Sequence, residues 1–299
     1  MKKFLAIILA MLMCLTVFVA CGPADVADDD ASGANLEDNA VVPENDVEEP
    51  SDEAEPSDEV EPAASDLQEI KDKGVLVVGI TDFAPMDYED ENGNWIGFDA
   101  DMAKAFAAYL GVDVEFQIID WDNKVMELNS KTIDVVWNGM TLTDEVKAAM
   151  ECSNAYCNNA QVVILPAETA ADYADKESMT DLLFAVEAGS AGEAEATAAG
   201  FKTVPVTDQA TALLEVKSGS ADAAVIDALM AGAMVGEGTN YAELTYTIGL
   251  NSEEYGVGFR KGSDAAAELN KFFAESYADG SMMATADIYG VEASIIPQA

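Results

Sequence analysis

The stretch from Asp120 to Tyr156 carries side chains suited to holding a small polar molecule. Trp121 follows an apolar run, and an aromatic ring at the carboxyl end of a strand can stack on a ligand. A second β-rich run, 133–137, ends at Asn138-Gly139 and is followed by Thr141 and a helix start. A strand that stops at a glycine before a helix leaves backbone N–H groups and hydroxyls facing open space. Taken singly, each residue is more typical of a core or a turn, so the predicted site rests on their combination.

The residue types also exclude several kinds of chemistry. The chain contains no His, which excludes Ser-His-Asp and Cys-His mechanisms and any His-ligated metal site. We expect no catalytic residues, no metal and no cofactor. Of the four cysteines, Cys14 and Cys21 belong to the N-terminal segment described next, and Cys152 and Cys157 could pair or stay free across a predicted turn. Free thiols are the favoured interpretation.

The N-terminal segment has the layout of a secretory signal. Lys2 and Lys3 precede an apolar run that ends in a small residue just before Cys21. A small residue before a cysteine at the cleavage point is typical of a lipoprotein, in which Cys21 becomes the lipidated N-terminus. We therefore expect a signal peptide at 1–20 and a protein tethered to the outer face of the cell membrane. The alternative, a membrane-spanning anchor, needs about 20 apolar residues and a downstream stop signal.

Residues 21–65 differ in composition from the rest of the chain. After Cys21 they are rich in Asp, Glu, Pro, Ser and Ala, and they contain no Lys or Arg. Such a segment buries too little apolar surface to offset its ordering entropy, and its like charges repel. We expect a disordered acidic linker between the lipid and a folded domain that begins near Asp66.

The folded part is itself acidic. Removing the 16 linker acids from the total of 57, and Lys2 and Lys3 from the 14 bases, leaves 41 acids against 12 bases. This field excludes nucleic acid and anionic surfaces as partners and favours solubility outside the cell. It does not by itself select a cationic ligand, because most of the charge should lie on solvated faces.

Strands and helices alternate through the folded part. The β-branched run 74–79 predicts a buried parallel strand, and the loop after it contains Asp82 and Phe83. Asp99 can cap the next helix, which Gly111 closes. The remaining elements of this βαβαβ unit are a hairpin over 87–98, strands at 112–118 and 133–137, and a helix at 124–131.

The pattern then repeats. Ser190 and Ala191 open a helix, and Asp227 ends an apolar strand with an acid. Strands are expected at 161–165, 184–186, 202–206, 221–227, 245–250 and 255–259, and helices near 190–200, 210–216 and 263–278.

Two α/β units joined by two crossing segments predict a hinged clamp. The first lobe should comprise 66–164 and 252–299 and the second lobe 165–251, with crossings near Leu165-Pro166 and 250–256.

Several motifs resemble one protein family. They are Gly97-Phe98-Asp99-Ala100-Asp101, Asp120-Trp121, Asn138-Gly139-Met140-Thr141, Ala221-Asp222-Ala223 leading to Asp227, and Tyr255-Gly256-Val257-Gly258-Phe259. From about Val75 to Gly290 the chain is similar to the polar-amino-acid branch of the solute-binding proteins of ABC importers. The resemblance implies a periplasmic-binding-protein-like α/β fold of two doubly wound lobes, with a ligand caught between them and delivered to a permease.

The resemblance also implies roles for individual residues. Phe83, beside Asp82, and Trp121 match the positions that stack on the ligand. Gly139 and Thr141, with the adjoining Asn138, match those whose backbone and hydroxyl meet the ligand's polar groups. Ser190 and Ala191 open a helix whose free N–H groups favour an anion. Asp227 matches the acid that holds the ligand's ammonium group, its alternative role being a strand-end cap or a solvated acid.

One position departs from the family pattern. Val146 stands where the resemblance implies an arginine that grips the ligand's carboxylate, and the only arginine of the chain is Arg260. Lys147 is a possible substitute, although one helical step rotates it by about 100°. Losing a charge-assisted pair in a desolvated cleft is worth about 2–5 kcal/mol. The class of ligand is therefore open.

The function predicted from these features is solute capture for an ABC importer, with an amino acid or related ammonium-bearing solute as ligand. The expected partners are that solute, a permease with its ATPase, and the membrane through the lipid anchor, with no nucleic acid and a monomeric state. The alternatives are a dehydratase-like enzyme acting on a small acid, and a sensor or surface lipoprotein that does not transport.

Overall fold

The computed structural model describes residues 65–299, apart from the side chain of Thr247. The predicted signal peptide at 1–20, the lipidated Cys21 and the linker up to residue 64 lie outside the described residues. Ser65, the last predicted linker residue, caps the first helix by accepting a hydrogen bond from the backbone N–H of Gln68.

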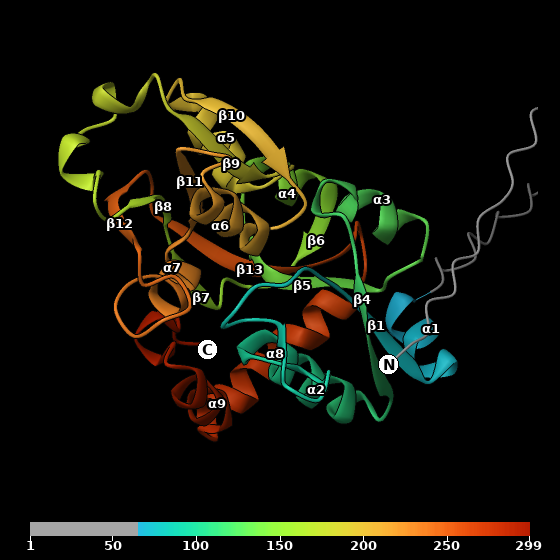
Figure 1. The fold of residues 1–299 in the computed structure, drawn as a ribbon. Coiled ribbons are helices and arrows are strands. Elements are labelled where there is room, and N and C mark those ends of the chain that lie inside the picture. The colour runs from blue at the N-terminus through green and yellow to red at the C-terminus, as the bar shows by residue number, and fades with distance from the viewer. Residues whose placement is uncertain (1–64) are drawn as a thin grey trace, which may run out of the picture. The chain divides into compact units, whose positions relative to one another are not determined.

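The first lobe is built on a mixed sheet with strand order β4-β1-β5-β13-β6, and β7 also pairs with β13 (Figure 1). β1, β4 and β5 run parallel, whereas β13 runs antiparallel to its neighbours, and this confirms the predicted βαβαβ unit. The strands are β1 (Val75–Ile80), β2 (Tyr88–Glu89), β3 (Trp95–Ile96), β4 (Asp113–Ile118), β5 (Val135–Thr141), β6 (Met150–Cys152), β7 (Cys157–Asn159) and β13 (Glu253–Arg260). The helices are α1 (Asp66–Lys73), α2 (Phe98–Leu110), α3 (Lys124–Asn129), α4 (Asp144–Ala149), α8 (Ala265–Ala278) and α9 (Ser281–Tyr289).

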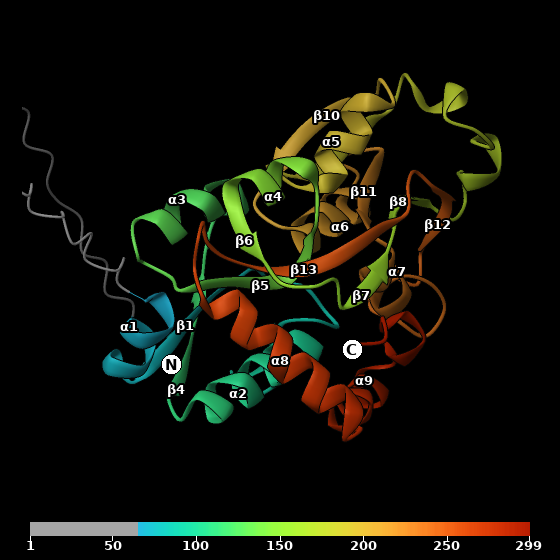
Figure 2. The same ribbon diagram turned by 180° about the vertical axis from the view of Figure 1, so that it is seen from behind.

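The two faces of this sheet pack against different helices. Leu76, Val78 and Trp137 join the apolar cluster of α2 and α8. The intervening side chains point the other way, so that Val136 and Met140 pack with residues of α3 and α4. Figure 2 shows α2 and α8 on one side of β5 and β13, and α3 and α4 on the other.

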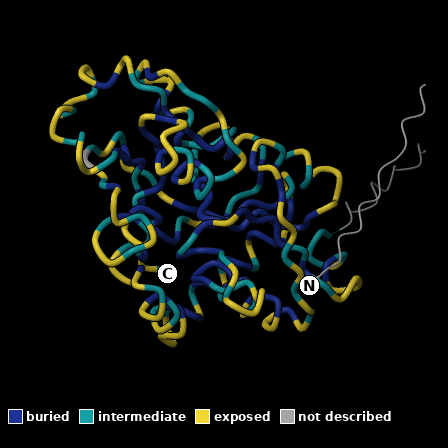
Figure 3. Tube along the Cα trace, viewed as in Figure 1, coloured by how far each residue is buried: buried dark blue, intermediate teal, exposed yellow. Residues whose placement is uncertain are grey.

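The second lobe is a five-stranded sheet with order β10-β9-β11-β8-β12. β9, β10 and β11 are parallel, and β8 runs antiparallel to β11 and β12. Its elements are β8 (Gln161–Pro166), β9 (Leu183–Glu187), α5 (Ala191–Ala198), β10 (Lys202–Val206), α6 (Gln209–Ser218), β11 (Ala223–Asp227), α7 (Ala228–Met234) and β12 (Leu244–Gly249). Ala196 of α5 packs on one face, and Leu213 of α6 and Met230 of α7 pack on the other. Buried residues follow the strands of both sheets (Figure 3).

The chain passes between the sheets at two places, near residue 160 and between residues 249 and 253. β8 belongs to the second sheet from its first residue, so the first crossing lies near residue 160 and not near Leu165-Pro166. The two crossings are joined by side chains, because Asn251 accepts a hydrogen bond from the backbone N–H of Gln161 and donates one to Glu253. This network lies where a hinge between the lobes would bend.

Two local expectations were wrong. β5 does not stop at Gly139 but continues to Thr141, and the register with β13 shifts between Gly256 and Gly258. Asp99 does not cap α2: the N-cap is Gly97, and Asp99 lies inside the helix with a fully buried side chain.

Two sequence features can be checked on the described part of the chain. Cys152 and Cys157 are free thiols, as favoured. No helix within residues 65–299 is long and apolar enough to cross a membrane.

Candidate functional site

A cavity of about 650 Å³ lies between the two lobes. The carboxyl ends of β1, β4 and β5 meet it from the first lobe, and those of β9 and β11 meet it from the second. Its size fits a small-molecule site, since such pockets span about 300–1,000 Å³. The residues discussed below that line it are Phe83, Trp121, Lys124, Asn138, Gly139, Thr141 and Val146 from the first lobe, and Gln161, Glu187, Ser190, Ala191, Gln209 and Asp227 from the second.

Eight of the residues predicted to hold a ligand lie in this wall: Phe83, Trp121, Asn138, Gly139, Thr141, Ser190, Ala191 and Asp227. Asp82 does not, because it is exposed and lines a separate groove beside Tyr88 while the next residue, Phe83, turns into the cavity. Lys147 is also exposed and outside the cavity wall. The helical rotation from Val146, which does line the cavity, directs Lys147 toward solvent.

Trp121 carries a cation on its ring. Trp121 is 7% exposed, and the ammonium of Lys124 lies 4.8 Å from its ring centroid. The same Nζ donates to the carbonyl of Trp121 at 3.1 Å and to the carbonyl of Gly189 in the second lobe at 3.0 Å. Lys124 therefore links the lobes at the cavity, and its pKa is lowered because it is buried there.

Gly189 allows the lobes to approach closely at this point. It has φ +69°, and a Cβ there would lie 2.7 Å from Oδ1 of Asp122 in the first lobe. A larger residue at 189 would strain the backbone and push Asp122 away. The first-lobe turn that carries Trp121 and Asp122 thus meets the second lobe directly.

Gly139 is required by both its conformation and its surroundings. It has φ +54°, and a Cβ would lie 2.3 Å from the ring of Phe83. Its N–H donates to the carboxylate of Asp99 at 2.7 Å, and Tyr156 donates to the same oxygen at 2.7 Å. The N–H that we expected to meet a ligand is therefore bonded to Asp99. Burial raises the pKa of Asp99 to about 6.

Two other expected ligand donors are also committed. The side-chain amide of Asn138 donates to the carbonyl of Thr81 at 3.1 Å and to Asp87 at 2.8 Å. The hydroxyl of Thr141 donates to Oε1 of Glu253 at 3.0 Å. Both residues line the cavity, yet their polar groups help to hold the first lobe and the crossing segments together.

Asp227 is a buried acid in the second-lobe wall. It is 3% exposed, and its carboxylate accepts hydrogen bonds from the side-chain amides of Asn159, Gln161 and Gln209. Burial and the neighbouring Glu253 carboxylate raise the pKa of Asp227 to about 8, although the Gln209 hydrogen bond acts in the opposite direction. A bound cation would favour the ionised form of this acid.

Glu187 is a second buried acid that sequence reasoning missed. It ends β9, next to β11, is 3% exposed, and has one carboxylate oxygen without a partner. Burial and the carboxylates of Asp227 and Asp208 raise the pKa of Glu187 to about 8, against weaker opposing effects of Gln209 and Lys124. The signal that singled out Asp227, an acid closing an apolar strand, is also present in Leu183–Glu187 and could have found Glu187.

Ser190 and Ala191 open helix α5, as predicted, and Ser190 is its N-cap, because its hydroxyl oxygen accepts a hydrogen bond from the N–H of Glu193 at 3.1 Å. The carboxylate of Glu193 in turn accepts a hydrogen bond from the N–H of Gly189 at 2.8 Å. The positive end of this helix thus already faces a carboxylate of its own. An anionic ligand group gains less there than the sequence predicted.

Comparison with known proteins identifies the family. The family model described as "Bacterial extracellular solute-binding proteins, family 3" matches residues 76–292. The chain belongs to this family. As a family member it is an extracellular solute-binding protein and not an enzyme.

Individual relatives agree with this assignment. The arginine-binding extracellular protein ArtP of Bacillus subtilis is 28% identical over 220 residues, which cover 70% of this chain and 84% of that protein. The crystal structure of a mutant of ArgBP from T. maritima is 33% identical with a TM-score of 0.71, covering 75% of this chain and 99% of that one. An ABC uptake transporter substrate-binding protein from Streptococcus pneumoniae with bound histidine is 27% identical with a TM-score of 0.70, covering 77% and 98%. The predicted fold class, two α/β lobes like those of periplasmic binding proteins, is confirmed.

Val146, where the resemblance implied an arginine, is 9% exposed and gives the solute-binding protein an apolar patch in the cavity wall. Within this wall Lys124 is the only basic side chain.

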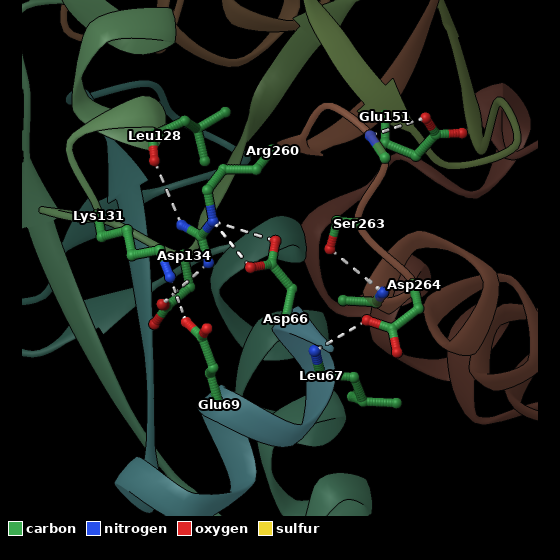
Figure 4. Close-up of polar contacts among 12 residues, drawn as sticks. Asp66, Leu67, Glu69, Leu128, Lys131, Asp134, Glu151, Arg260, Ser263 and Asp264 are labelled. Atoms are coloured by element: carbon green, nitrogen blue, oxygen red, sulfur yellow. Dashed lines mark hydrogen bonds and ion pairs between the residues drawn. The ribbon is translucent and has the colours of Figure 1, made fainter. Parts of the chain in front are cut away.

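Arg260 lies away from the cavity, in the network of Figure 4. Its guanidinium bonds Asp66 of α1 at 3.0 Å and the carbonyl of Ile133 at 2.9 Å, and it lies 3.7 Å from Asp134. Arg260 therefore fastens α1 to the sheet of the first lobe and offers nothing to a solute.

Proposed function

We propose that this solute-binding protein captures an amino acid or a related small ammonium-bearing solute between its lobes and delivers it to a membrane permease with its ATPase. The observation that carries the proposal is Asp227, a buried acid in the wall of a cavity that both lobes line. Relatives whose names state cystine, arginine, histidine or glutamine support an amino acid or a related solute.

The roles proposed for the wall follow from its chemistry. Asp227 accepts the hydrogen bonds of the solute's ammonium group, and charge-assisted bonds of this kind are about twice as strong as neutral ones. Phe83 and Trp121 contact its apolar part from the opposite lobe. Because the solute touches both lobes, it binds the closed form more tightly and shifts the population toward closure.

The proposed place of action is the outer face of the cell membrane. Cys21 carries the lipid in this proposal, and the acidic segment up to residue 65 spaces the monomeric binding domain from the membrane. Replacing Cys21 by Ser should release the protein from the membrane fraction of its host, whereas an unchanged distribution would refute the anchor.

A thermal-shift screen tests the function. A solute present at a hundredfold excess over its Kd should stabilise the protein by about 2.7 kcal/mol. For a domain of this size that corresponds to a rise in melting temperature of about 5–11 °C. If no amino acid, amine or small zwitterion raised the melting temperature, the proposed function would be refuted.

A further inference from the structure

The buried polar atoms of the cavity wall that lack a hydrogen-bond partner favour a ligand with N–H donors. Among the lining residues, the buried side-chain atoms without a hydrogen-bond partner are Oε1 of Gln161 and Oε1 of Glu187. Their residues are 2% and 3% exposed. The amide oxygen of Gln161 is an acceptor, and so are both oxygens of Glu187 once its carboxyl group is ionised; leaving a buried acceptor unpaired costs about 1–3 kcal/mol. A ligand that satisfies this wall must bring N–H donors.

The ionisable residues of the cavity wall also favour a cationic ligand. They are five acids and one base: Asp122, Asp144, Glu145, Glu187, Asp227 and Lys124. The ammonium of Lys124 already donates to the carbonyls of Trp121 and Gly189, and with three protons it has at most one left. The wall is therefore negatively charged once Glu187 and Asp227 lose their protons, and a bound cation favours that loss.

Three donors of the cavity wall that could hold a ligand carboxylate are already paired. The N–H of Gly139 donates to Asp99, and the hydroxyl of Thr141 donates to Glu253. At the start of α5, the carboxylate of Glu193 holds the N–H of Gly189. The remaining wall around α4 presents the apolar side chain of Val146. A carboxylate placed here would lose its hydration and gain few donors.

Glu187 and Asp227 form a pair that suits a cation rich in N–H groups. They end β9 and β11, which are neighbouring parallel strands paired at Ala185 and Ala224. Both residues line the cavity, and the charge of Asp227 acts on the carboxyl group of Glu187, so the two groups can reach one solute at the same time.

We propose that the cavity takes a dicationic solute without a carboxylate, such as a diamine or an aminoalkyl guanidine, and that Glu187 is its second carboxylate partner beside Asp227. This proposal rests on the proposed function and narrows the class of solute. Two ionised carboxylates and a solute with two positive groups form a buried cluster with no net charge, whereas an α-carboxylate on the solute would add an unpaired negative charge.

The test compares solutes that differ only in the carboxylate. Isothermal titration calorimetry of the full-length protein measures L-arginine against agmatine and L-lysine against cadaverine. We expect each decarboxylated amine to bind at least about tenfold more tightly than its parent amino acid, the factor that corresponds to 1.4 kcal/mol. If the amino acids bind more tightly, this inference is overturned while the proposed function stands. If none of the four binds, this inference is likewise overturned, and the thermal-shift screen of other amino acids and amines decides the proposed function.

A matched pair of variants tests the role of Glu187. Glu187→Gln keeps the size of the side chain but removes its charge, and we expect agmatine to bind at least about tenfold more weakly. Glu177→Gln makes the same change at an exposed position of the second lobe and should leave the affinity unchanged. If Glu187→Gln keeps its melting temperature and its affinity for agmatine, Glu187 is not a partner of the solute.

Discussion

Replacing Asp227 with Asn should weaken the binding of a cationic solute, by a factor that grows with pH. Asp227 is 3% exposed and accepts hydrogen bonds from three amides, so a solute ammonium would pair with it out of water. Truncating one partner of such a buried pair costs about 2–5 kcal/mol. The pKa of Asp227 is raised to about 8, so at pH 7 the solute must first displace a proton, which offsets about 1.4 kcal/mol. The expected penalty is then about 0.6–3.6 kcal/mol, or roughly 3- to 400-fold, at pH 7.

Near pH 9 the carboxyl group is already ionised and the full penalty returns. The ratio of the two dissociation constants should therefore rise by about tenfold between pH 7 and pH 9. Calorimetric titration with agmatine at both pH values measures this ratio for the wild type and Asp227→Asn. The control is Asp181→Asn, because Asp181 is fully exposed in the same lobe and pairs only with Lys202 at the surface. A ratio within twofold of one at both pH values, in a variant with an unchanged melting temperature, would refute the reasoning.

Three further predictions follow from the same geometry. The wild-type affinity for a cationic solute should rise as pH increases from about 6 to 9. Burial raises the pKa of both Glu187 and Asp227 to about 8, and the ionised forms bind the cation. An affinity that stays level in calorimetric titrations across this pH range would contradict the prediction. Val146→Arg should improve binding of L-arginine relative to agmatine by about tenfold or more, whereas Val146→Met, similar in length but uncharged, should not. Trp121→Ala should weaken solute binding by about 1–3 kcal/mol. Arg260→Ala should leave the affinity unchanged but lower the free energy of unfolding by about 3 kcal/mol. In calorimetry that corresponds to a fall of roughly 6–12 °C in melting temperature.

The sequence predicts the order of strands and helices well because each buried strand is a short β-branched run bounded by turn residues. It predicts less well to which sheet a strand belongs. The run of β8 is apolar on both faces and would fit either lobe, and only its pairing with β11 and β12 assigns it to the second. The sequence also did not predict that the strand through Asn138 and Gly139 continues to Thr141. The bulge in this strand forms only where it pairs with β13.

Placement in the cavity wall was largely predictable, since residues at the carboxyl ends of parallel strands meet at one edge of a sheet. The direction in which a polar group points was not predictable. Asn138 and Thr141 line the cavity but bond Asp87 and Glu253, which are 51 and 112 residues away in sequence. Lys124 was missed because its partner carbonyl belongs to Gly189, in the other lobe.

A crystal structure of the protein with agmatine bound would show whether Asp227 and Glu187 hold the solute. We expect the solute in the cavity between the lobes, with a positively charged nitrogen about 3 Å from the carboxylate of Asp227. A second nitrogen should lie near Glu187. A solute bound outside this cavity, or one whose cationic groups face away from both carboxylates, would contradict this expectation.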